Sequence, residues 1–85
     1  MKNRMETLES LHDYTLEDIL KAEIKIRMHD DKEDDDVLKD FERKSPVGQV
    51  AVTKKEYVAE REKEIARLHT VLETIERMIE REHKQ

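Results

Sequence analysis

Residues 53–84, TKKEYVAEREKEIARLHTVLETIERMIEREHK, decide the fold. The stretch opens with Thr53-Lys54-Lys55-Glu56, a T-x-x-E capping box, in which a threonine hydroxyl and a glutamate satisfy the first free amides of a helix. Apolar residues then recur at alternating spacings of three and four, as on a helix with one apolar stripe. The stretch therefore predicts one long helix from Lys54 to about His83.

The apolar stripe of this helix is wider than a two-stranded coiled coil requires, because apolar residues also occupy g positions of the heptad. A wide stripe needs more than one neighbouring helix. Arg61 interrupts the stripe at a d position, where Glu60, Glu64 or a partner's carboxylate is the expected counter-ion. We therefore predict an all-α fold: an antiparallel helical hairpin with a long C-terminal coiled-coil-like helix, forming a dimeric bundle. The residues predicted for self-association are Val58, Ile65, Leu68, Val71, Leu72, Ile75, Met78 and Ile79.

Residues 1–29 predict the helical N-terminal half of the hairpin, as one helix or two. A three-four spacing runs through Met1, Met5, Leu8, His12, Thr15, Ile19, Ala22 and Ile26. Thr15 has two interpretations, because it either caps a second helix or continues a single one that begins near residue 3. Residues 22–29 also alternate apolar and polar side chains, so an alternative interpretation pairs them with residues 47–52 in a short β-ribbon.

Residues 30–52 connect the two helical regions, and we predict an acidic connector, a short helix and a loop. Asp35 or Asp36 would cap the short helix, over residues 37–42. Residues 45–48, Ser-Pro-Val-Gly, form the one clear turn signal, with proline suited to its second position.

The composition favours a single helical domain over residues 1–85. Of these 85 residues, 46% are charged and only 35% hydrophobic, too little apolar material for a thick core. The absence of cysteine argues against a disulfide scaffold and favours the reducing cytoplasm. No stretch approaches the ~20 apolar residues that a membrane helix requires, so we expect no membrane contact.

The negative charge is concentrated in residues 30–36, DDKEDDD. Their six acids and one base sum to −5, which equals the net charge of the chain. Such a run either presents a negative surface to a basic partner or is a solvated connector. It nearly matches an EF-hand calcium loop, but Asp36 stands where that loop needs glycine and Lys39 where it needs a ligand, so we predict no metal. The residues predicted to bind a partner are Asp30, Asp31, Glu33, Asp34, Asp35, Asp36 and Phe41.

A basic end of the hairpin is the second candidate surface. Arg43, Lys44, Lys54 and Lys55 flank the predicted turn, and two of them lie at a helix N-terminus, where backbone amides can receive a phosphate. The alternative interpretation is charge balance at a helix end.

No enzymatic chemistry is predicted. His69 and Glu73 lie one helical turn apart, but two ligands are too few for a metal site. There is no cysteine nucleophile or glycine-rich phosphate loop, and neither Ser10 nor Ser45 has a histidine and an acid at a recognised spacing. We therefore predict no catalytic residue and no cofactor.

Together these patterns favour a small cytoplasmic protein-interaction module, an adaptor or inhibitor of the kind found among phage and regulatory proteins. It would self-associate through its C-terminal helix, as a homodimer or a higher assembly. Its acidic surface would face a larger protein, such as a nucleic-acid-handling enzyme, with no small-molecule substrate. The alternatives are a nucleic-acid-binding dimer that uses the basic end and a structural coiled-coil subunit.

Overall fold

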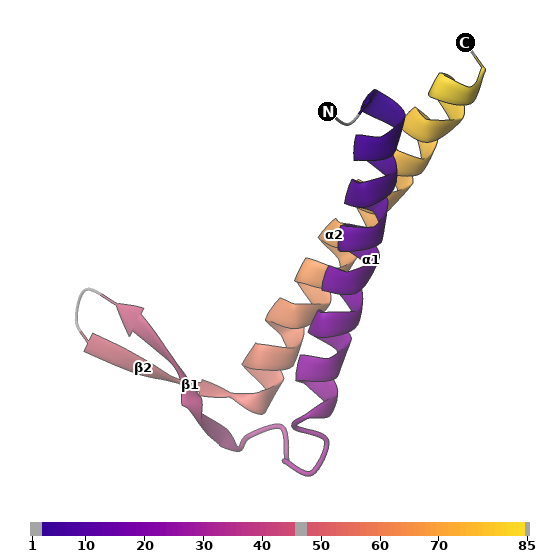
Figure 1. Cartoon of the computed structure of the whole chain (residues 1–85). Helices are drawn as coiled ribbons and strands as arrows, with labels where there is room; N and C mark the ends of the chain where they lie inside the picture. Colours follow the sequence, from indigo (N-terminus) through magenta and orange to yellow (C-terminus); the bar gives the residue numbers. More distant parts are fainter. Residues whose placement is uncertain (1–2, 46–47, 85) are drawn as a thin grey trace.

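Two long antiparallel helices form a stalk, and a β-hairpin projects from the end at which they are connected (Figure 1). The computed structural model describes residues 3–45 and 48–84, with side chains described for 3–38 and 52–84. The chain order is α1 (Arg4–Arg27), β1 (Val37–Ser45), β2 (Gly48–Thr53) and α2 (Lys54–His83). The predicted antiparallel helical hairpin is therefore confirmed, and the β-hairpin is an addition to it. Within the described ranges, neither helix is long and apolar enough to cross a membrane.

The C-terminal helix α2 has the predicted bounds, because its start is set by the predicted cap. Thr53 has an extended backbone, and its hydroxyl accepts a hydrogen bond from the Glu56 amide at 3.2 Å. The same hydroxyl donates to the Glu56 carboxylate at 3.2 Å. Residue 53 therefore ends β2 and caps α2 at once, so the β-hairpin leads directly into the helix.

Removal of this cap has a measurable cost. In Thr53→Ala we expect the free energy of unfolding to fall by about 1 kcal/mol, the usual value for a lost N-cap hydroxyl. Urea denaturation followed by circular dichroism measures the change. Thr70→Ala is the matched control, because the Thr70 hydroxyl only donates to the Ala66 carbonyl on the exposed surface of α2. An equal midpoint for Thr53→Ala and the parent would contradict the capping role.

The N-terminal half is a single helix, so the capping interpretation of Thr15 is wrong. Asn3 caps α1, since its side-chain oxygen accepts from the Glu6 amide at 2.8 Å. Thr15 is buried in mid-helix, and its hydroxyl donates to the Leu11 carbonyl at 2.7 Å. That bond satisfies the hydroxyl within the helix and lets the apolar seam continue past it. Because α1 extends to Arg27, the alternative β-ribbon through residues 22–29 is also wrong.

The two helices pack along the three-four seam that the sequence predicts. The described members of the α1 seam are all buried or half-buried: Met5, Leu8, His12, Thr15, Ile19, Ala22 and Ile26. On α2, the buried residues are Tyr57, Leu68, Leu72 and Ile75. Ile19, Leu68 and Leu72 form one core cluster, with Ile65 packed against it. Near the chain ends, the Arg4 guanidinium is 2.7 Å from a Glu82 carboxylate oxygen, which joins the helices across the antiparallel pair.

The connector contains a β-hairpin where the sequence predicted a short helix over residues 37–42, so that prediction is wrong. Val37 pairs with Thr53, Leu38 with Val52, and Ser45 with Gly48, with an irregular register between Leu38 and Arg43. Pairing β1 with the valine-rich β2 forms hydrogen bonds along the facing edges of the two strands and buries Leu38 with Val52, which outweighs the local helix signal. The predicted turn lies between Ser45 and Gly48, and its central residues 46–47 lie outside the described residues.

A second, smaller core holds the β-hairpin to α2. Leu38 from β1, Val52 from β2 and Tyr57 from the first turns of α2 form a buried cluster, which we call the hairpin root. Each of the three side chains is at most 6% exposed. An isolated two-stranded ribbon is marginal in water, so this contact is what stabilises the pair of strands.

Candidate interaction surfaces

The acidic run forms the loop between α1 and β1, at the end of the stalk opposite the chain termini (Figure 1). We call residues 30–36 the acidic loop. All seven of its side chains are exposed. The run is therefore accessible to a basic partner.

The backbone of the acidic loop is held against the N-terminus of α2. The Asp36 carbonyl accepts from the Lys54 amide at 2.8 Å, and the Asp34 carbonyl accepts from the Lys55 amide at 3.0 Å. The Lys54 ammonium donates to the Lys32 carbonyl at 2.7 Å. Within the loop, the Glu33 amide donates to the Asp36 carboxylate at 2.8 Å. The carboxylates also lie near the positive end of the α2 dipole, which favours this placement.

The predicted basic end is of mixed charge where the structure describes it. Lys54 and Lys55 line a cavity of about 430 Å³ together with Asp30 and Asp34. Glu62 lines the same cavity, so its charged residues sum to −1. Arg43 and Lys44 belong to β1, but their side chains lie outside the described residues, as does that of Phe41.

Most of the residues predicted for self-association serve the contact between α1 and α2. Leu68, Leu72 and Ile75 are buried within the single chain. Val58, Ile65, Met78 and Ile79 are half-buried, and only Val71, at 39%, counts as exposed. Self-association through α2 stays a prediction, and within the closed hairpin only its partly exposed residues are accessible to another chain.

Sequence reasoning missed an apolar surface on α1. The side chains of Leu16, Leu20, Ile24 and Met28 are 45%, 56%, 51% and 65% exposed. We call these four residues the α1 ridge. Their regular spacing of four was the available signal, but it was overlooked because the three-four seam already accounted for one apolar face of the helix.

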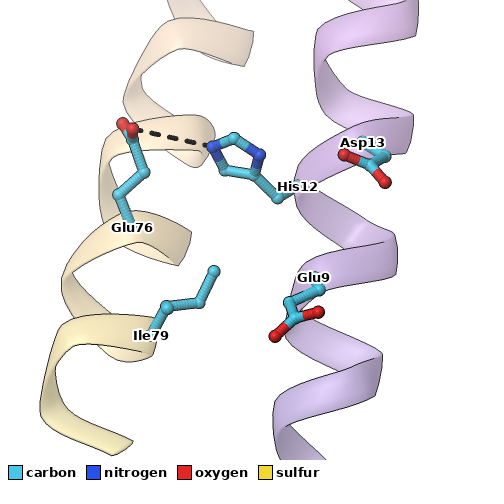
Figure 2. Close-up of a pocket in the computed structure, with 5 residues that line it drawn as sticks. All are labelled: Glu9, His12, Asp13, Glu76 and Ile79. Atoms are coloured by element: carbon cyan, nitrogen blue, oxygen red, sulfur yellow. Dashed lines mark ion pairs between the residues drawn. The ribbon is translucent and has the colours of Figure 1, made fainter. Parts of the chain in front are cut away.

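A polar cavity of about 400 Å³ lies between the helices nearer the chain termini, lined by Glu9, His12, Asp13, Glu76 and Ile79 (Figure 2). His12 Nε2 points across the gap to a Glu76 carboxylate oxygen at 3.6 Å (Figure 2). Within the described part of the chain, no three potential ligands converge on a metal position. When His12 is protonated, its contact with Glu76 is an ion pair that links α1 to α2.

An aromatic and cationic cluster joins the end of α1 to the start of α2. The rings of His29 and Tyr57 meet edge to face, with centroids 5.2 Å apart. The Arg61 guanidinium lies 5.5 Å from the centroid of the Tyr57 ring, in cation–π geometry. Arg61 also pairs with Glu64 at 2.8 Å, which confirms one of the counter-ions predicted from the sequence. The cluster therefore fixes the base of the stalk next to the acidic loop.

Comparison of the chain with family models, curated proteins and solved structures finds no match.

Proposed function

We propose that this protein is a small cytoplasmic interaction module, an adaptor or inhibitor without enzymatic activity. In this proposal it associates with further copies of itself and offers the acidic loop to a basic surface of a larger protein. A nucleic-acid-handling enzyme is the class of partner that fits best. Such enzymes carry basic surfaces that bind phosphates, and the carboxylates of the loop would bind there in place of the phosphates.

One observation carries the proposal: an exposed acidic loop whose backbone is already fixed. The loop carries a charge of −5 over seven residues. Its carbonyls at positions 32, 34 and 36 are hydrogen-bonded to the first residues of α2. A partner would meet charges whose backbone is already ordered, so less conformational entropy is lost on binding. Concentrated exposed charge also accelerates encounter with an oppositely charged surface.

Binding of nucleic acid is the competing function, and the described charges favour it less. A phosphate that approaches Lys54 or Lys55 also approaches Asp30 and Asp34, which line the same cavity. The repulsion from these carboxylates offsets the attraction of the lysines.

The test neutralises part of the loop without disturbing its backbone. In Asp31→Asn/Asp34→Asn/Asp35→Asn we expect unchanged helicity, because the replaced side chains are exposed and Asp36, which bonds the Glu33 amide, is retained. The variant should lose capture of the specific partner that the parent retains from a native extract. The parent's association rate with that purified partner should fall as ionic strength rises, and the variant should show a weaker dependence. Affinity capture with mass spectrometry and stopped-flow kinetics measure these effects.

The control is Glu9→Gln/Asp18→Asn/Glu73→Gln, which changes the net charge by the same amount at exposed positions on the two helices. It should capture the partner as the parent does. Equal capture by the loop variant and the parent at every ionic strength would overturn the acidic surface. Binding of a labelled duplex DNA or RNA by the parent, with a steep salt dependence, would favour the competing function.

A further inference from the structure

The α1 ridge is a continuous apolar line on the outside of the stalk. Its members, Leu16, Leu20, Ile24 and Met28, are spaced by four, so they lie along one i±4 row of the helix surface. Each is about half exposed or more, although α1 already buries a different face against α2. Single exposed leucines are common, but four large apolar side chains in one row form a surface that another helix can cover.

The row of side chains next to the ridge carries segregated charge. It consists of Asp13, Glu17, Lys21 and Lys25, in the order acid, acid, base, base. All four side chains are exposed, and Glu17 and Lys21 lie 3.8 Å apart. The acidic half thus precedes the basic half along the helix.

This order makes the row self-complementary in one orientation only. When a second α1 helix runs antiparallel, Asp13 and Glu17 of one copy lie beside Lys21 and Lys25 of the other. When it runs parallel, the row lies beside the opposite edge of the partner's ridge, so its acids and bases do not meet each other. The antiparallel arrangement also opposes the two helix dipoles favourably.

We infer that the α1 ridge is the surface for a second copy of this chain, packed antiparallel about a two-fold axis near Leu20. This inference rests on the self-association in the proposed function and assigns it to α1 in place of α2. The ridges interlock as i±4 rows, the packing class with helices crossing at about −50°. Both copies use the same patch, as a two-fold interface requires. The hairpins stay closed, so the seam between α1 and α2 is unchanged.

The test compares two double variants of equal chemistry. Leu20→Lys/Ile24→Lys places charge on the ridge. Leu11→Lys/Val71→Lys is the control, because it places the same charge at two exposed apolar positions outside the ridge, one on each helix. Sedimentation equilibrium from 1 to 100 µM should give a dimer for the parent and the control. The ridge variant should sediment as the 10.2 kDa monomer, with dimerisation at least about a hundredfold weaker and helicity unchanged.

Charge reversal tests the orientation. Glu17→Lys should weaken the dimer about tenfold, because it places two lysines side by side on each side of the two-fold axis. Glu17→Lys/Lys21→Glu should restore most of the affinity in the antiparallel dimer. Absence of this rescue would overturn the orientation.

The outcomes separate this inference from the proposed function. A parent that is monomeric over the whole range overturns self-association itself and the inference with it. A dimer that survives in the ridge variant but dissociates in the control overturns the ridge alone, and favours assembly through the exposed part of α2.

Discussion

Leu72→Asp is expected to unfold the protein at room temperature. Leu72 is 9% exposed and packs with Ile19 and Leu68 in the core between the helices. Truncation of a buried leucine alone costs about 2–5 kcal/mol, and an unpaired buried carboxylate adds several more. A domain of this size has a total stability of about 4–13 kcal/mol. Loss of most of the far-UV helical signal at 25 °C, without denaturant, is the expected measurement.

The neighbouring residue provides the control. Val71 is 39% exposed, and Val71→Asp places the same carboxylate where water can solvate it. We expect this variant to keep its helical signal and to lose at most about 1 kcal/mol of stability. If the two aspartate variants unfolded alike, the assignment of Leu72 to the core and Val71 to the surface would be wrong.

Tyr57→Ala is expected to detach the β-hairpin from the stalk. Tyr57 is 6% exposed and belongs to the hairpin root. Its ring also contacts His29 and Arg61. Removal of a buried aromatic side chain costs about 3–5 kcal/mol, which in a domain of this size lowers the melting temperature by at least about 12 °C. Thermal denaturation measures the loss. Hydrogen exchange should in addition show faster exchange of the β2 amides than of the central α2 amides.

The other tyrosine of the chain is a matched control for this experiment. Tyr14 is 60% exposed on α1, so Tyr14→Ala should change the free energy of unfolding by less than about 0.5 kcal/mol. A similar small effect for Tyr57→Ala would show that the hairpin root does not hold the strands in place.

Both helices were predictable because their signals are local. The cap of α2 lies within four residues, Thr53 to Glu56, and the seam positions recur every three or four residues along each helix. These patterns need no knowledge of distant contacts. Thr15 was ambiguous for the same reason, because a threonine followed by an acid three residues later has one sequence pattern whether it caps a helix or continues it.

The β-hairpin was not predictable in this way because strand pairing is non-local. Residues 37–42 have apolar side chains at positions 37, 38 and 41 after a run of aspartates, which fits a short capped helix. What decides against it is the pairing of Val37 and Leu38 with Thr53 and Val52, about fifteen residues away. Burial of Leu38 against Tyr57 of α2 then stabilises the pairing.

The candidate surfaces likewise have features that the sequence predicts and features that depend on distant contacts. The exposure of the acidic loop followed from its composition, but its attachment to α2 depends on the Asp34 and Asp36 carbonyls. Every residue has a backbone carbonyl, so the residue types do not indicate which carbonyls form these hydrogen bonds. The spacing of four in the α1 ridge is visible in the sequence. Only the structure shows that α2 packs on a different face of α1, so that the four ridge side chains stay exposed.

An isotope-filtered nuclear Overhauser experiment on an equal mixture of ¹³C-labelled and unlabelled protein tests the proposed dimer directly. In this dimer each hairpin closes on itself and meets its partner through the α1 ridge. This arrangement predicts contacts between the methyl groups of Leu16 and Ile24 in the intermolecular spectrum, and Ile19–Leu72 contacts only in the intramolecular one. Intermolecular Ile19–Leu72 contacts would contradict it, because they would show that α1 of one chain packs on α2 of another.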